Sequence, residues 1–128
     1  MQILLDTHAF LWWIEDDLRL SAVARATIED GANDVFFSAA SGWEIAIKSQ
    51  IGKLRLPENL EQFVSEHVYR NNFTVLPIQL SHTLSVHSLP LLHRDPFDRI
   101  LVAQSMIEKM PLLTVDPQIS QYEAETIW

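Results

Sequence analysis

The sequence contains no cysteine, so disulfides and thiolate metal sites are excluded. No apolar run approaches the roughly 18 residues that a membrane-spanning helix needs. The N-terminus, MQILLDTHAF, has no basic segment of the kind that begins a signal peptide, and it carries an acid at position 6. We therefore expect a cytoplasmic protein that makes no membrane contact.

Basic residues are also scarce, with 9 Lys and Arg against 17 Asp and Glu and a net charge of -8 at pH 7. Nucleic-acid-binding domains usually carry a basic surface, so the overall charge argues against that class. Some bases nevertheless lie close in sequence to Glu44 or Asp98, namely Lys48, Lys53, Arg55, Arg94 and Arg99. They fit a local basic rim around an acidic site, and equally an ordinary mixture of surface charges.

The length of 128 residues fits one domain, which we expect to span residues 1–128. A chain of this size buries roughly two thirds of its unfolded surface, enough for one ordinary core. Apolar residues make up 48% of the chain, a composition that is typical of a folded protein rather than a disordered one.

Short apolar runs alternate with helix-like segments along most of the chain. The expected strands are 3–5, 34–38, 73–78, 112–115 and 125–128. The expected helices are 7–14, 21–32, 39–51, 57–70, a short one from Ser81, and 97–109. This alternation predicts an α/β fold in which a mostly parallel sheet of about four to five strands is covered by helices on both faces.

Several polar residues mark helix starts. Thr7 and Ser21 are candidate caps of the first two helices. Asp95 followed by Pro96 is a capping carboxylate with proline at the first helical position. Asp95 is alternatively an acid that supports the ligands of a functional site, and we favour the cap.

Four acids from distant segments are candidates for chemistry, and each has a simpler explanation. Asp6 follows a strand, and capping of the next helix would by itself explain an acid there. A favourable interaction with the helix dipole would by itself explain Asp98, and a place in a turn would explain Asp116. Glu44 is the hardest to explain as an ordinary exposed acid, because no other charge lies in AASGW before it or IAI after it.

The positions of Asp6 and Asp116 indicate that the acids converge. Each follows a short apolar strand, and parallel sheets place their sites outside the carboxyl ends of the strands. Gathered carboxylates repel one another unless a cation lies among them. Oxygen ligands select Mg²⁺ or Mn²⁺, and two such ions roughly 4 Å apart can activate water for phosphodiester cleavage.

Four stretches, LLDTHAFLWW, SAASGWEIAIK, HRDPFDRILVAQ and LLTVDPQISQY, resemble the four acidic motifs of PIN-domain proteins, most closely those of VapC-type toxins of bacterial toxin–antitoxin pairs. They occur in the family's order from residue 3 to about 122. The resemblance implies a three-layer α/β/α sandwich and one or two Mg²⁺ or Mn²⁺ ions. It also implies that the catalytic and metal-binding residues are Asp6, Glu44, Asp98 and Asp116.

The resemblance further implies a metal-dependent endoribonuclease, the toxin of a pair, that cleaves RNA with metal-activated water. Its expected partners are an RNA substrate, a cognate antitoxin and a second copy in a homodimer. The possible secondary site residues are Thr7, Thr114, Asp95 and Arg99. Thr114 matches a hydroxyl-bearing position of the family, and Arg99 is the preferred phosphate contact, although a surface ion pair is an equal alternative.

Two other functions stay open. A PIN-like fold without activity could act as a binding module through protein partners, and a metal-dependent phosphatase could use a similar sheet. The order Asp, Glu, Asp, Asp and the DPFD helix start argue against the phosphatase. We expect His8 to be a polar helix residue rather than a ligand. Trp12 and Trp13 are candidates for a partner contact, with core packing favoured for at least one.

Overall fold

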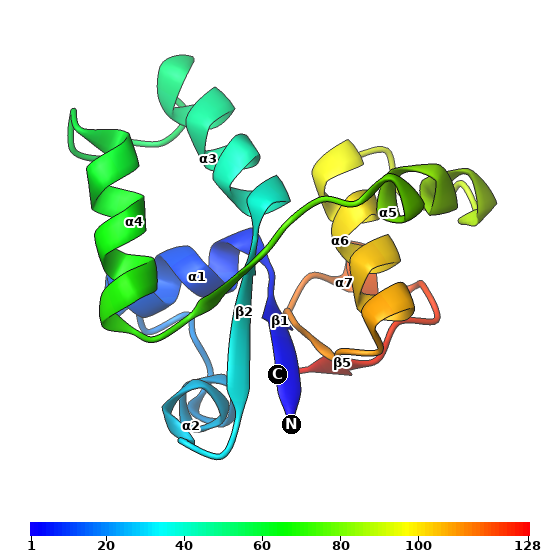
Figure 1. Cartoon of the computed structure of the whole chain (residues 1–128), viewed down its shortest axis with the longest axis horizontal. Helices are drawn as coiled ribbons and strands as arrows, with labels where there is room; N and C mark the ends of the chain where they lie inside the picture. Colours follow the sequence, from blue (N-terminus) through cyan, green and yellow to red (C-terminus); the bar gives the residue numbers. More distant parts are fainter.

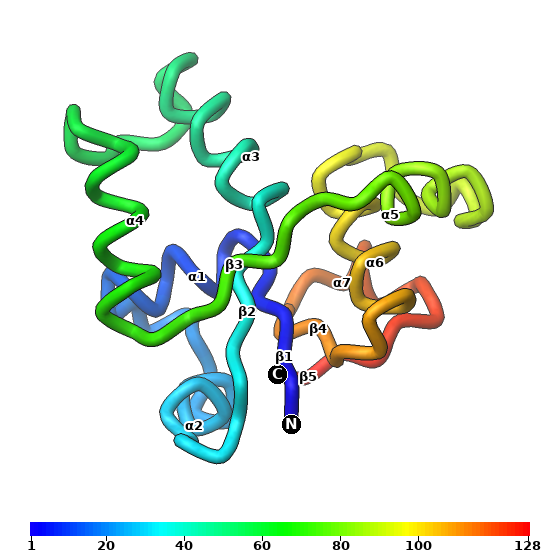
Figure 2. The backbone as a smooth tube through the Cα atoms, viewed as in Figure 1, coloured from blue at the N-terminus to red at the C-terminus, as the bar shows by residue number.

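The computed structural model describes residues 1–128 and is built on one parallel sheet of five strands in the order β3-β2-β1-β4-β5 (Figures 1 and 2). The strands are β1 (Gln2–Leu5), β2 (Asp34–Ser38), β3 (Thr74–Leu76), β4 (Leu112–Leu113) and β5 (Thr126–Ile127). The helices are α1 (Thr7–Ile14), α2 (Ala22–Glu29), α3 (Ala39–Gln50), α4 (Leu60–Arg70), α5 (Leu80–Ser85), the 3-10 turn η1 (Val86–Ser88), α6 (Pro96–Glu108) and α7 (Pro117–Ser120). The expected α/β class with a parallel sheet is confirmed.

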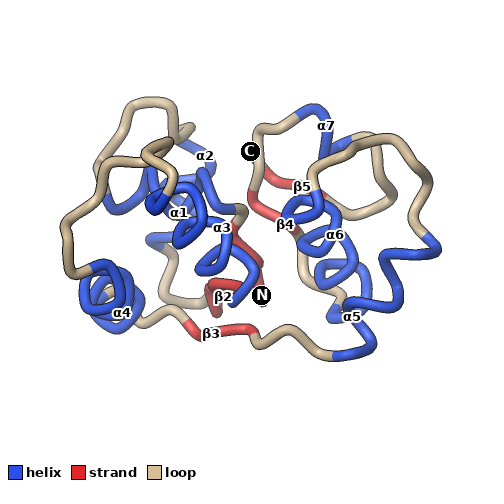
Figure 3. The backbone as a smooth tube through the Cα atoms, turned by 90° about the horizontal axis from the view of Figure 1, so that it is seen from above, coloured by secondary structure: helices blue, strands red, loops and turns tan.

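Side chains of the central strand alternate between two cores. Ile3 and Leu5 belong to a cluster that also contains residues of α1, α2 and α4, whereas Leu4 belongs to a second cluster with residues of α6. Successive side chains of a strand point to opposite faces, so both faces of β1 are covered. Figure 3 shows the two groups of helices on either side of the strands. These are the three layers of an α/β/α sandwich.

The order in which strands are added to the sheet changes direction beside β1. From β1 the chain adds β2 and then β3 on one side, and later adds β4 and β5 on the other. Ligands of open parallel sheets bind outside the carboxyl ends of the strands at such a switch point. Asp6 directly follows β1, and Thr114 directly follows β4. The topology therefore brings the first and fourth acidic motifs to one place.

Helix starts follow the sequence signals with two corrections. Ser21 and Asp95 cap α2 and α6 as expected. Thr7, however, is the first helical residue of α1, and Asp6 is its cap. The helix expected from Pro57 begins only at Leu60, because residues 54–59 stay irregular. Leu54 and Leu56 pack against the first core cluster from this irregular segment.

The strands are shorter than expected at several ends. β3 covers three residues rather than 73–78, since Pro77 has no N–H to donate. β4 covers only two residues, yet the Thr114 N–H still donates to the Ile127 carbonyl at 3.1 Å. No helix combines the length and apolarity needed to cross a bilayer. The single domain over 1–128 stays a prediction.

Candidate functional site

Asp6 lies at the carboxyl end of β1 and is 5% exposed. Its Oδ1 accepts a hydrogen bond from the Ala9 N–H at 2.7 Å, and its Oδ2 accepts one from Thr114 Oγ1 at 2.5 Å. Burial raises the pKa of Asp6, and the nearby charge of Asp116 adds to that rise, whereas the bonds from Thr114 and Ala9 lower it. Asp6 is thus both a helix cap and a buried acid.

Thr114 joins the first and fourth motifs. Its hydroxyl donates to Asp6, and the same oxygen accepts a bond from the Asp116 N–H at 3.1 Å. Asp116 in turn caps α7, since its Oδ1 accepts the Gln118 N–H at 2.8 Å. The hydroxyl expected to matter at position 114 therefore fixes both acids relative to each other.

Glu44 projects from α3 and is 3% exposed. Its Oε1 accepts a hydrogen bond from Thr7 Oγ1 at 2.6 Å, and its Oε2 pairs with the Lys48 ammonium one turn further along the helix. Thr7 Oγ1 also lies 2.9 Å from Ser41 Oγ. Burial lowers the pKa of Lys48, but the hydrogen bond and charge of Glu44 outweigh this effect, so that the net pKa is raised. The Lys48 ammonium is thus held as a cation beside Glu44.

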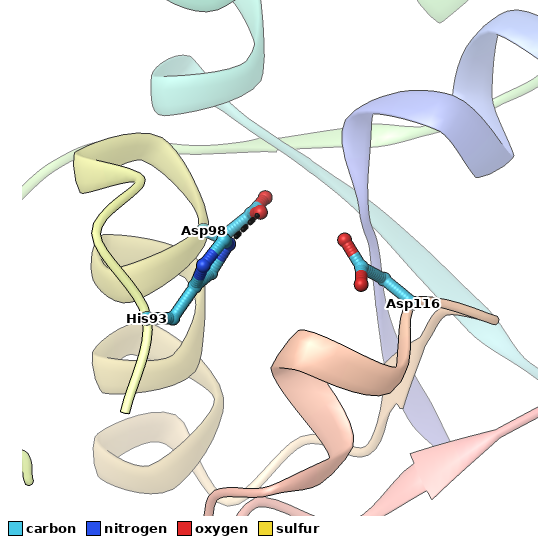
Figure 4. Close-up of side chains that lie close together, drawn as sticks. All are labelled: His93, Asp98 and Asp116. Atoms are coloured by element: carbon cyan, nitrogen blue, oxygen red, sulfur yellow. Dashed lines mark hydrogen bonds and ion pairs between the residues drawn. The ribbon is translucent and has the colours of Figure 1, made fainter. Parts of the chain in front are cut away.

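Asp98 lies in the first turn of α6, and its Oδ2 is 2.8 Å from His93 Nε2 (Figure 4). Burial, together with the charges of Asp95, Glu44 and Asp116, raises the pKa of Asp98 to about 6 despite the hydrogen bond from His93. The pKa of Asp98 is therefore raised by acids of two other elements, α3 and the start of α7, and by the cap of its own helix. Asp95 serves as the cap of α6, because its Oδ1 accepts from the Phe97 and Asp98 N–H groups.

An aromatic pair links the helices that carry Glu44 and Asp98. The Trp43 ring on α3 meets the Phe97 ring on α6 edge-on, with centroids 5.0 Å apart. Each aromatic residue directly precedes one of the two acids in the sequence. The contact therefore helps to hold the second and third motifs together.

The four acids Asp6, Glu44, Asp98 and Asp116 are called the acidic cluster below. Charge effects link them, because Asp116 raises the pKa of Asp6, and Glu44 and Asp116 raise that of Asp98. Ligand atoms of Asp98 and Asp116 and a ring nitrogen of His93 all lie within 4.8 Å of one another. Carboxylates that are buried together resist ionisation, and a cation among them removes this penalty. The donor set of several carboxylates and one imidazole fits a divalent metal ion.

The structure does not support a phosphate contact by Arg99. The side chain is 8% exposed, and its guanidinium donates to the Pro90 carbonyl at 2.9 Å, the Val86 carbonyl at 3.1 Å and the Tyr122 hydroxyl at 2.9 Å. The Arg99 side chain thus joins α6 to the segment after α5 through hydrogen bonds. Of the basic residues expected to form a rim, Lys48 pairs with Glu44, while Arg94 is exposed.

Three side-chain contacts of the site were not predicted from the sequence. Glu44 and Lys48 stand four residues apart on one helix, a spacing that could have revealed their pair. The bond from Thr7 to Glu44 spans 37 residues and has no local signal. The approach of His93 to Asp98 depends on how the loop enters α6 at Pro96, which spacing alone does not show.

Trp12 and Trp13, considered for a partner contact, both pack against the first core cluster. The Trp13 indole N–H donates to Asn71 Oδ1 at 2.9 Å, and the Trp12 ring meets the Trp128 ring edge-on. Core packing, the favoured role, is therefore confirmed for both. His8 is an exposed residue of α1, and its charge lowers the pKa of Asp6.

Comparison with known proteins points in one direction. Residues 3–125 match the family model described as PIN domain. A stretch of 59 residues is 39% identical to Ribonuclease VapC16 of Mycobacterium tuberculosis (strain ATCC 25618 / H37Rv), covering 46% of this chain and 42% of that protein. The match thus spans less than half the length of this relative.

A solved structure resembles the whole fold. The crystal structure of VapBC2 from Rickettsia felis bound to a DNA fragment from their promoter contains a chain that superposes with a TM-score of 0.73 at 14% sequence identity. The superposition covers 100% of this chain and 98% of that one. At this identity the likeness concerns the fold.

Proposed function

The chain belongs to the PIN-domain family, and from this premise we propose that it is a metal-dependent endoribonuclease and the toxin of a toxin–antitoxin pair. The observation that carries the proposal is the acidic cluster at the switch point of the sheet. Two of its members, Asp6 and Asp98, have raised pKa values because they are buried beside other acids. A site that gathers carboxylates at such a cost in stability is typical of one built for a cation.

The acids fit Mg²⁺ or Mn²⁺ in number and chemistry. Asp6, Asp98 and Asp116 would hold one or two ions, and Glu44 would complete the site. When bound, such an ion supplies a Lewis acid that neutralises charge on a phosphodiester and promotes deprotonation of water near neutral pH. The high folded pKa of Asp98, about 6, means that binding has to compete with a proton in mildly acidic solution.

The remaining residues orient the acids. Thr7 and Lys48 each hold one oxygen of Glu44, so that the carboxylate points in one direction and is able to accept a proton from attacking water. Thr114 holds Asp6 and the backbone of Asp116 in register. No covalent intermediate with the protein is required, because the attacking group in the proposed reaction is water.

The partners follow from the family and the relatives. The relative from M. tuberculosis is called a ribonuclease, and the similar solved chain belongs to a VapBC2 assembly on DNA. We therefore propose RNA as the substrate, a cognate antitoxin as the inhibitor, and a homodimer as the active assembly. We also propose a cytoplasmic location, where a cellular RNA would meet the protein.

The proposal is tested by incubating total RNA with the purified protein in Mg²⁺, in Mn²⁺ and in EDTA, beside Asp6→Asn and the control Asp34→Asn on the exposed start of β2. Discrete fragments are expected with either metal for the parent and the control, and none with EDTA or with Asp6→Asn. Circular dichroism verifies that both variants are folded.

Other outcomes point to the alternatives. Full activity in folded Asp6→Asn contradicts the assignment of the site. Intact RNA from a protein that binds no Mn²⁺ favours the inactive binding module. Rapid turnover of a small phosphate ester by the parent protein favours a phosphatase.

A further inference from the structure

His93 stands out because it lies among the acids although it is not one of the family's four acidic positions. It sits in the loop between η1 and α6, two residues before the cap Asp95. Its Nε2 is 2.8 Å from Asp98 Oδ2, and the two side chains are 18% and 17% exposed. Figure 4 shows the imidazole beside Asp98, with Asp116 facing them from the start of α7.

The position of the ring distinguishes a ligand from a supporting residue. A histidine that only supports a ligating carboxylate binds it from behind, away from the ion. Here a ring nitrogen lies within 4.8 Å of the ligand atom of Asp116 as well as that of Asp98. The imidazole is therefore on the side of Asp98 that faces the other acid.

The separation of His93 and Asp98 also suits shared coordination. Two ligand atoms at adjacent corners of an octahedral ion with bonds of about 2.1 Å lie about 3 Å apart. The observed 2.8 Å between Nε2 and Oδ2 is close to this value. The same two atoms can thus make a hydrogen bond without metal and neighbouring metal bonds with it, once the proton that they share has been released to solvent.

The other two acids have their oxygens engaged. Both oxygens of Asp6 accept hydrogen bonds, from Ala9 and Thr114, and both oxygens of Glu44 are held by Thr7 and Lys48. Asp98 Oδ1 and Asp116 Oδ2, by contrast, have no hydrogen-bond partner in the chain. The most available ligand atoms of the site therefore gather around His93.

From this geometry we infer that His93 is a nitrogen ligand of the metal ion, together with Asp98 and Asp116. This inference rests on the metal dependence proposed above and extends it to the ligand set. Carboxylate and water oxygens suit Mg²⁺, whereas imidazole favours first-row transition ions. The site should therefore prefer Mn²⁺ to Mg²⁺, and His93 should be the origin of that preference.

The test is pulsed electron paramagnetic resonance of the full chain loaded with Mn²⁺, prepared with natural and with ¹⁵N-labelled histidine. A nitrogen bound directly to Mn²⁺ modulates the echo, and the isotope changes that modulation. We expect a histidine signal in the parent protein, its loss in His93→Gln, and its retention in His8→Gln, the control for another histidine whose charge reaches the cluster.

Calorimetric titrations give a second readout. His93→Gln should bind Mn²⁺ about tenfold more weakly or worse, with a much smaller change for Mg²⁺, so that the preference for Mn²⁺ falls. Bound Mn²⁺ without histidine coupling in the parent protein would overturn the ligand role, as would unchanged coupling in His93→Gln. Even if His93→Gln does not fold, an uncoupled parent spectrum overturns the ligand role.

The spectrum also separates this inference from the proposed function. Histidine-coupled Mn²⁺ in a protein that leaves RNA intact supports the ligand role and contradicts only the ribonuclease. Uncoupled Mn²⁺ in a protein that cleaves RNA contradicts only the ligand role. A protein that binds no Mn²⁺ contradicts both.

Discussion

The two sides of the acidic cluster differ in how the chain treats their carboxylates. On one side, Asp6 and Glu44 are almost fully buried, and each has both oxygens held by donors of the chain. On the other, Asp98 and Asp116 are partly exposed, and each has one oxygen held, by His93 and by the Gln118 N–H respectively. The first pair is fixed before any ligand arrives, whereas the second pair is left with free lone pairs.

This difference separates two tasks within one site. A buried carboxylate with complete hydrogen bonding keeps its orientation but has fewer lone pairs for a ligand. Neighbouring ionised carboxylates repel one another until a cation binds, and a carboxylate with one free oxygen offers lone pairs to that cation. We therefore assign the strongest metal contacts to Asp98 and Asp116, and an orienting role to the donors around Asp6 and Glu44.

The largest expected effect is on the affinity for Mn²⁺, and it should differ between an acid from each side of the cluster. Asp98→Asn should lower the affinity for Mn²⁺ about 100-fold or more, whereas Glu44→Gln should lower it at most about tenfold, the lower end of the range for outer-shell changes. Isothermal titration calorimetry measures both. Equal losses in the two variants, or a larger loss in Glu44→Gln, would contradict the division of the cluster.

The next effect concerns stability on the hydrogen-bonded side. Thr114→Val removes the hydroxyl that donates to Asp6 and accepts from the Asp116 N–H. A buried polar group left without its partner destabilises the fold by about 1–3 kcal/mol, which urea unfolding measures. Thr114→Ser keeps the hydroxyl and should retain most of the stability. A Val variant as stable as the parent would show that these bonds contribute nothing net.

The free energy of unfolding should depend on pH, mainly through Asp98 on the side of the cluster with fewer hydrogen bonds. Asp98 has a pKa of about 6 in the folded protein against an ordinary value of 3.8, so the folded state binds its proton more tightly than the unfolded state. The resulting stabilisation is fully present below about pH 3.8 and is lost as the pH rises through about 6. After allowance for partial exposure, the loss is on the order of 1–2 kcal/mol.

Urea unfolding in EDTA from pH 4 to pH 7.5 measures this dependence. Asp6, whose pKa is also raised by burial, adds in the same direction, so Asp98→Asn should flatten the decline without abolishing it. An identical decline in the parent and in Asp98→Asn would locate the linkage elsewhere. Saturating Mn²⁺ should stabilise the parent more at pH 7.5 than at pH 5.

The smallest effect concerns the contact that joins the two sides. Trp43→Ala removes the edge-on packing against Phe97 between α3 and α6. Such a pair is worth about 0.5–1.5 kcal/mol beyond buried area, and Trp43→Phe should retain part of it. Urea unfolding compares the two variants. Equal stability of Trp43→Ala and the parent would mean that other contacts hold Glu44 near Asp98.

Local chemistry made much of the fold predictable. The run Ile3–Leu5 alternates across both cores of a covered sheet, and Ser21 and Asp95 cap the helices they precede. The resemblance of four motifs to the PIN-domain family pointed to the acids that the fold then gathers at the switch point. Hydrophobic periodicity alone does not identify Asp6 as a site residue in preference to any other aspartate that caps a helix.

The rest depended on contacts between distant segments. The burial of Arg99 is possible only because the segment after α5 turns two carbonyls toward it, and nothing near position 99 shows this. The segment before α4 packs Leu54 and Leu56 against the first core cluster, a contact that helix propensity does not show. His93 reaches Asp98 only through the bend that precedes Pro96.

The most direct test of the central claim measures Mn²⁺ occupancy and RNA cleavage on the same preparation. Room-temperature electron paramagnetic resonance reports free and bound Mn²⁺ at each concentration, while the initial cleavage rate is followed on the same samples. We predict that the cleavage rate rises in proportion to Mn²⁺ occupancy and vanishes when EDTA removes the ion. Cleavage that persists without bound metal, or a fully occupied site that leaves every RNA intact, would contradict it.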